Sequence, residues 1–227
     1  MNKLMTVGRD IPSVLFGAQD EYKHLYESDP RAALKLPVTL QSGFGQLKMG
    51  TALAVNTSSS STNYNKTIPY DQSAKTGAEA SADARAYIVQ DGAGTTSVSV
   101  TIDDSYKFIV GDEIQAIDAD TTSADLGAIT DIDRTTYPTR AVITTTNALS
   151  SGYTTANFAY VALKGSDACV GILEKSVNTG TGANAQGAIA TMVLGNAIFR
   201  SGMLTNVDSA ARTDLSASTY GAFTYMK

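Results

Sequence analysis

The sequence predicts a mainly β fold with minor helix, in which a small β-rich base is interrupted by an inserted β-barrel or β-sandwich and preceded by an extended arm. Three observations lead to this prediction. Apolar runs are short, and none approaches the about 18 residues of a membrane span. Turn-forming residues separate many of these runs at regular intervals. Acidic residues are concentrated in the middle, which divides the chain into an arm (1–36), a base (37–76 and 164–227) and an insertion (77–163).

The charge distribution argues against a nucleic-acid partner. The net charge is −5, but residues 78–163 hold twelve acidic and four basic side chains, and the remainder holds ten acidic and thirteen basic ones. An acidic module of −8 therefore interrupts a mildly basic flank of +3. Hydrophobic residues make up 43% of the chain and charged residues only 17%. Such a low charge favours a surface that packs against other proteins, because free surfaces usually carry more charge.

The base is organised around a short strand that follows Gly50. Alternation places Leu53 and Val55 on one face and two small alanines on the other. We expect Leu53 and Val55 to share a core with Ile172 and Val193. These come from two distant apolar segments, and the base strands are therefore expected at the following ranges: 37–40, 51–55, 68–71, 169–177 and 189–194.

Three further features of the base are predicted from local residue types. Residues 57–67 have no apolar period and are expected to form a mobile polar loop. Gly195-Asn196 suggests a tight hairpin turn into a strand at 197–199. Asp208 is a suitable N-cap for a short helix that ends at Leu215.

The insertion shows six candidate strands separated by turn signals such as Asp91-Gly92 and Gly111-Asp112. Short strands at such spacing are typical of a small barrel or sandwich. The six candidates are Ala86–Gln90, Ser97–Asp103, Glu113–Ile117, Gly127–Ile132, Arg140–Thr146 and Ala156–Leu163.

The arm carries apolar side chains that are costly to leave in water. They either pack on the chain's own body or anchor the arm on a neighbouring protein, and the sequence leaves both alternatives open. The candidate contact residues are Val14, Leu15, Phe16, Tyr22 and Tyr26.

Enzymatic chemistry is not indicated, and no cofactor or metal is expected. His24 is the only histidine, and Cys169, the only cysteine, lies in an apolar strand pattern that favours burial. Residues 180–185 fit the relaxed dinucleotide pattern G-x-G-x-x-A, but a β-patterned segment follows where that site needs a helix. A cluster of carboxylates misses the spacing of a calcium-binding EF-hand loop, and aspartate is also a good turn residue. Nothing singles out two of them as a glycosidase pair, and the scarcity of aromatic residues beside them argues against a sugar platform. These carboxylates are Asp118, Asp120, Asp125, Asp131 and Asp133.

Four short motifs in the base resemble the head decoration proteins of tailed bacteriophages, of the lambda decoration-protein type. They are M-G-T-A-L-A-V-N (49–56), I-P-Y-D (68–71), V-G-I-L (170–173) and I-A-T-M-V-L-G (189–195), with Ile198 and Phe199 after the last. The long arm and the insertion depart from the family's simple pattern.

The resemblance implies a capsid cement protein, made in the host cytoplasm and located on the outer surface of the virion. Its partners would be the major capsid protein and itself, as a homotrimer at three-fold positions, with no nucleic acid and no membrane. An extended arm fits this role, since strand addition supplies main-chain hydrogen bonds with little sequence demand. The alternative is a virion-surface adhesin whose insertion binds a host glycan or protein.

Overall fold

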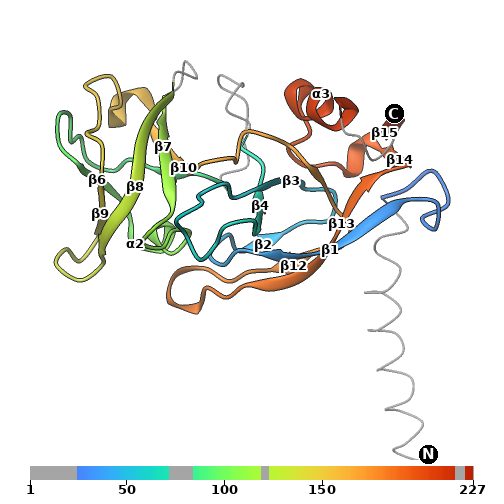
Figure 1. Cartoon of the computed structure of the whole chain (residues 1–227), viewed down its shortest axis with the longest axis horizontal. Coiled ribbons are helices and arrows are strands. Elements are labelled where there is room, and N and C mark those ends of the chain that lie inside the picture. Colours follow the sequence, from blue (N-terminus) through green and yellow to red (C-terminus); the bar gives the residue numbers. More distant parts are fainter. Residues whose placement is uncertain (1–24, 72–83, 119–122, 218–222, 227) are drawn as a thin grey trace, which may run out of the picture.

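The computed structural model describes residues 25–71, 84–118, 123–217 and 223–226 (Figure 1). The predicted fold class is confirmed, because the described chain is mainly β and its two large sheets form closed or nearly closed barrels. The strands are β1 (Leu34–Leu40), β2 (Gln46–Leu47), β3 (Ala52–Val55), β4 (Thr67–Pro69), β5 (Ala86–Tyr87), β6 (Ser97–Thr101), β7 (Glu113–Ile117), β8 (Ser123–Asp133), β9 (Arg140–Thr145), β10 (Tyr160–Leu163), β11 (Gly171–Leu173), β12 (Val177–Asn178), β13 (Ala188–Gly195), β14 (Ala197–Arg200) and β15 (Phe223–Met226). The helical segments are α2 (Ile102–Ser105), α3 (Ser209–Ala217) and the 3-10 turns η3 (Thr155–Asn157), η4 (Gly182–Asn184) and η5 (Ser201–Met203).

The base is a closed barrel in the order β1-β13-β11-β3-β4. Strands more than 100 residues apart meet in it, with Ile172 opposite both Val193 and Ala52. Leu53, Ile172 and Val193 are fully buried, whereas Val55 is only half-buried at the end of β3. The small residues Ala52 and Ala54 are also fully buried, so both faces of β3 are covered within the chain itself.

Strand β1 begins at Leu34, three residues before the predicted start, and pairs antiparallel with β13 along its whole length. Strand β4 reaches it only at Leu40. The Gln41 N–H donates to the Thr67 carbonyl at 2.9 Å. Backbone nitrogens of every second residue in a strand point to the same side, so the nitrogen of Pro37, four residues earlier, also faces β4. Because β4 does not extend to Pro37, the missing N–H of this proline interrupts no ladder bond.

The predicted hairpin at Gly195-Asn196 is wrong. Strand β14 instead pairs in parallel with β15, with Phe199 opposite Tyr225. Asn196 has a φ of 55°, which redirects the chain from the barrel into this second sheet. The reason is packing, because Phe199 is fully buried and stacks on Phe223 with ring centroids 5.5 Å apart.

The strand expected at 169–177 is wrong as a single element, because it is divided into β11, which belongs to the barrel, and β12, which pairs with β2. The predicted short helix is present as α3, and Asp208 Oδ1 accepts a hydrogen bond from the Ala211 N–H at 2.7 Å, as an N-cap should.

The insertion forms a six-stranded sheet in the order β5-β10-β7-β8-β9-β6. Its ends approach each other, since the Val89 N–H donates to the Ser99 carbonyl at 2.9 Å and Gln90 bridges Ser99. Strand β7 has the predicted bounds. Strand β6 is shorter than predicted, because Thr101 accepts from the Asp104 N–H and starts the helical turn α2. Residues 156–159 are not strand, because η3 precedes β10.

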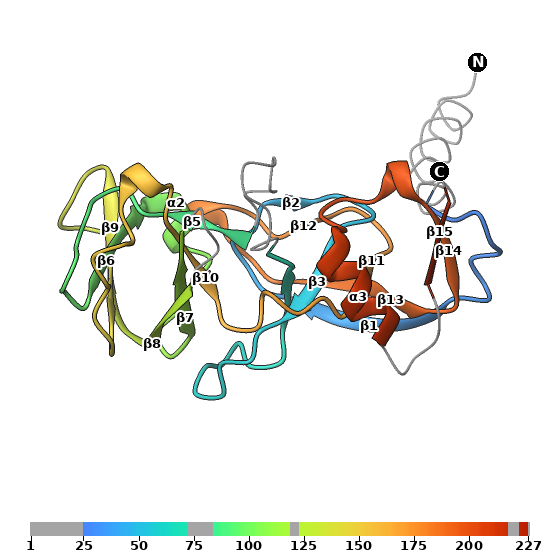
Figure 2. The same cartoon turned by 90° about the horizontal axis from the view of Figure 1, so that it is seen from above.

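The base and the insertion lie side by side along the long axis of the molecule (Figure 2). The two chain crossings between them are adjacent, because the Asp71 N–H donates to the Ser166 carbonyl at 2.8 Å. The buried apolar cluster continues from one unit into the other and includes Leu53 of the base and Phe108 of the insertion. The two units therefore share one core.

Candidate functional surfaces and the junction of the two units

The chain segment 25–28, here called the arm root, is fixed to the base by an isolated antiparallel bridge between Tyr26 and Phe199 of β14. The Glu27 N–H donates to the Ile198 carbonyl at 2.8 Å, and the Arg200 N–H donates to the Leu25 carbonyl at 3.0 Å. Ser28 Oγ accepts from the Ile198 N–H at 3.1 Å. The arm root is therefore held at a defined place on β14.

A buried carboxylate joins the arm root to the barrel. Glu174 is 5% exposed, and its Oε1 accepts from the Tyr26 hydroxyl at 3.1 Å and from Lys35 Nζ at 2.5 Å. The Tyr26 ring also packs on Phe199 with centroids 5.5 Å apart. A single side chain of the base thus holds both the arm root and β1.

The structure corrects one of the arm candidates. Tyr26 is only 3% exposed and packs on the chain's own body, so it is not available as a contact to a capsid. Its hydroxyl finds a partner in Glu174, which makes burial of the ring favourable. The other four candidates, Val14, Leu15, Phe16 and Tyr22, lie outside the described residues.

Two leucines beside the arm root are exposed to solvent. Leu34 and Leu36 are 40% and 46% exposed on β1, and a short turn at residues 29–33 connects them to the arm root. Ile189 is 82% exposed on β13, near the opposite end of β1. Single exposed aliphatic side chains are normal, but neighbouring ones such as Leu34 and Leu36 provide apolar area that another protein can cover.

A buried polar network joins the base to the insertion. Asp112 is fully buried, and its Oδ1 accepts from Asn56 Nδ2 at 3.2 Å and from Ser61 Oγ at 2.5 Å. Asn56 Nδ2 also donates to Gln41 Oε1 at 3.0 Å. The second oxygen of Asp112 accepts from the Ile109 N–H at 2.9 Å, so the carboxylate is fully partnered.

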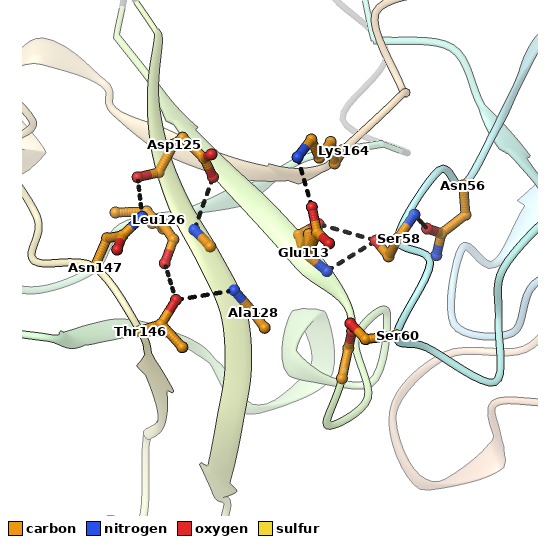
Figure 3. Close-up of polar contacts among 12 residues, drawn as sticks. Asn56, Ser58, Ser60, Glu113, Asp125, Leu126, Ala128, Thr146, Asn147 and Lys164 are labelled. Carbon is orange, nitrogen blue, oxygen red and sulfur yellow. Dashed lines mark hydrogen bonds and ion pairs between the residues drawn. The ribbon is translucent and has the colours of Figure 1, made fainter.

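The expectation of a mobile loop at residues 57–67 is contradicted. Ser58 Oγ accepts from the Glu113 N–H at 2.8 Å, and Lys164 Nζ pairs with the Glu113 side chain (Figure 3). Ser58 and Ser61 are buried against the insertion. Apart from Tyr64 the segment is polar, and its hydrogen bonds connect the two units.

A second buried cluster lies where the chain enters the insertion. Arg85 Nε contacts Asp71 Oδ1 at 2.8 Å, and the Tyr160 hydroxyl donates to Asp71 Oδ2 at 2.9 Å. The guanidinium also lies over the Tyr160 ring, 4.2 Å from its centroid. Burial raises the pKa of Asp71 above its usual range, and the charge and hydrogen bond of Arg85 oppose this effect.

The chain matches no protein-family model, no curated protein and no solved structure. Its function must therefore be inferred from the surfaces and contacts described above. No helix among the described residues is long and apolar enough to cross a membrane.

Among the described residues, those considered for catalysis or metal binding are not brought together. His24 and Asp120 lie outside the described residues. Asp125 Oδ1 accepts from the Gly127 N–H, and Asp133 Oδ1 accepts from two N–H groups of the following turn. Within residues 25–71, 84–118, 123–217 and 223–226, no three potential ligands cluster around a possible metal position. Residues 180–185 lead through η4 into strand β13, so no α-helix follows the glycines.

Cys169 is expected to be unreactive while the protein is folded. It is 5% exposed, and burial raises the pKa of its thiol to about 12. At pH 8 only about one molecule in 10⁴ would carry the reactive thiolate. Ellman's reagent at pH 8 should therefore titrate no thiol in the native protein and one thiol in 6 M guanidinium chloride. Rapid reaction of the native protein would contradict this burial.

Sequence reasoning missed one feature of the insertion, an exposed apolar cluster formed by Tyr87, Val89 and Phe158. Their exposed fractions are 38%, 42% and 72%. Tyr87 lies opposite Tyr160, and the Ile88 N–H donates to the Ala159 carbonyl at 2.9 Å, so the chain at Val89 runs next to the backbone of Phe158. No sequence signal identified the cluster, because residues 156–163 read as one continuous strand.

Proposed function

We propose that this chain is a non-enzymatic cement protein that binds the outer surface of a viral capsid and clamps neighbouring coat subunits. It would act as a homotrimer at three-fold positions of the shell. The observation that carries the proposal is the arm root, which Glu174 ties to β1 and which β14 pairs along its backbone. A clamp must transmit force, and this attachment would pass tension from residues 1–24 directly into a closed barrel.

Two further properties support the proposal. Leu34 and Leu36 provide exposed apolar contact area beside the arm root, where a coat subunit held by the arm would lie. The shared core and the Asp112 network make the base and the insertion one mechanical body. Three-fold repetition would then multiply weak individual contacts by avidity.

The test adds the purified protein to shells stripped of their surface proteins and measures the temperature at which the shells break. We expect the parent protein to raise this temperature clearly. The double variant Leu34→Ser/Leu36→Ser should bind the shells more weakly and raise it less. Val110→Ser, which alters a 57% exposed side chain of the insertion, is the matched control and should act as the parent does.

Equal protection by the parent and the leucine variant would show that Leu34 and Leu36 of the base do not contact the shell. No protection by the parent would end the proposal.

The exposed cluster of Tyr87, Val89 and Phe158 favours a second candidate function. In it the insertion of a virion-surface adhesin binds a host molecule, and the base only holds the insertion in place. The shell experiment separates the two, because an adhesin would leave the breaking temperature unchanged.

A further inference from the structure

The backbone at Phe158 is strained, and the strain exposes its ring. Phe158 has a φ of 52° and a ψ of 34°, in the left-handed region that aromatic residues rarely occupy. The conformation is held by two backbone bonds, from the Phe158 N–H to the Thr155 carbonyl and from the Ala159 N–H to the Thr154 carbonyl, both 3.2 Å. Asparagine or glycine would fit this backbone at lower cost, so core packing does not explain a phenylalanine here.

The ring gains no burial in return for the strain, since 72% of the residue remains exposed. The neighbouring segment exposes two other side chains, Tyr87 and Val89, which point to the same face of the sheet because they are two residues apart. The Ile88–Ala159 hydrogen bond brings this segment next to the backbone of Phe158. Strained residues that persist in folded proteins cluster at binding sites and active sites.

Acidic side chains flank the cluster, and Arg85, which interacts with Tyr87, is paired with the buried Asp71 carboxylate. Asp91 follows Val89 by two residues, and its carboxylate accepts from the Thr155 N–H at 2.7 Å, which places it at η3. On the other side of β10, Ile117 lies opposite Tyr160, so Asp118 follows at the level of Ala159. The whole insertion carries a net charge of −8 over residues 78–163. An apolar centre with acidic flanks is complementary to a basic surface that presents an apolar side chain.

We propose that Tyr87, Val89 and Phe158 form a docking site for a basic segment of another protein, which inserts an aromatic or aliphatic side chain between its positive charges. Val89 and Phe158 offer no hydrogen bond to a sugar hydroxyl, and the acidic flanks repel an anionic lipid surface. Both considerations favour a protein partner. The inference concerns the second candidate function and does not depend on whether the base binds a capsid.

The absence of tryptophan from the chain allows a direct assay. The probe is a synthetic peptide with one tryptophan between lysines, and the full-length protein is titrated into it while tryptophan fluorescence is recorded. We expect a saturable blue shift that weakens as salt is added. A peptide with serine in place of every lysine, and one with serine in place of tryptophan (followed by calorimetry), should bind at least about tenfold more weakly.

Phe158→Asn is the decisive variant, because it removes the ring and suits the left-handed backbone. We expect it to bind the probe at least about tenfold more weakly and to melt at the same or a higher temperature than the parent. Val89→Thr should also weaken binding while it preserves the shape of the side chain. Val110→Asn, at another exposed position of the insertion, should bind as the parent does.

Unchanged binding by Phe158→Asn and Val89→Thr would overturn the proposal. So would equal binding of the lysine-free peptide, or saturable binding of a neutral oligosaccharide that Phe158→Asn abolishes. If Phe158→Asn melts at a lower temperature than the parent, Val89→Thr decides the outcome.

Discussion

Replacing Arg85 by alanine is expected to lower the free energy of unfolding by roughly 3–5 kcal/mol. Among the described residues, the substitution leaves the Asp71 carboxylate, whose side chain is fully buried, with the Tyr160 hydroxyl as its remaining side-chain partner. An unpaired buried charge is costly because the protein interior solvates it poorly. The loss is a large part of the 5–15 kcal/mol by which a domain is usually stable. Urea unfolding followed by circular dichroism measures it.

The matched control is Arg200→Ala. Arg200 forms the same kind of contact, with its Nε 2.7 Å from Glu27 Oε1, but the two side chains are 47% and 39% exposed. Exposed pairs are worth about 0–1 kcal/mol, so this variant should unfold nearly as the parent does. Similar effects of the two substitutions would show that Arg85 is not a buried partner of Asp71.

The pH dependence of the Arg85→Ala variant has a definite sign. Burial already raises the pKa of Asp71, and removing Arg85 raises it further. A carboxyl with a raised folded-state pKa is favoured when protonated, so the penalty is present above that pKa and shrinks as the pH falls through it. The stability difference between parent and variant should therefore narrow between pH 7 and pH 4. A difference that widens on acidification would contradict this account.

Replacing Leu53 by aspartate is expected to prevent the base from folding. Leu53 is fully buried in β3 and is paired on both sides, with Gly171 and with Pro69. The substitution removes apolar contacts and buries a charge without a partner, at a cost of several kcal/mol. The measurement is the yield of soluble protein and its near-ultraviolet circular dichroism.

Ile189→Asp is the control for Leu53→Asp. It introduces the same charge into the same barrel, but Ile189 is 82% exposed. Surface substitutions usually change stability by about 0.5 kcal/mol or less, so this variant should fold. A soluble and fully folded Leu53→Asp protein would mean that the core lies elsewhere.

The fold class could be predicted because the alternation of apolar and polar residues along the sequence matches the side chains that are buried in the structure. Strand β7 has its predicted bounds, since Ile114 and Ala116 alternate with more exposed residues after the Gly111-Asp112 turn. The base core could be proposed because Leu53, Ile172 and Val193 lie in short apolar strands. Side-chain alternation is a local property and is visible in a single sequence.

The long-range contacts could not be predicted. Asn56 and Asp112 are 56 residues apart and look like ordinary loop residues, and Glu174 and Tyr26 are 148 residues apart. The parallel pairing of β14 with β15 has no local signal either, and Gly195-Asn196 has the composition of a hairpin turn. These features depend on which segments meet in the fold, and short-range residue preferences carry no such information.

Electron cryomicroscopy of capsids decorated with this chain tests the central proposal most directly. The account predicts knobs of three copies at three-fold positions, with the base barrel against the shell and Leu34 and Leu36 in contact with a coat subunit. Particles with no density at these positions, or with only the insertion touching the shell, would contradict it.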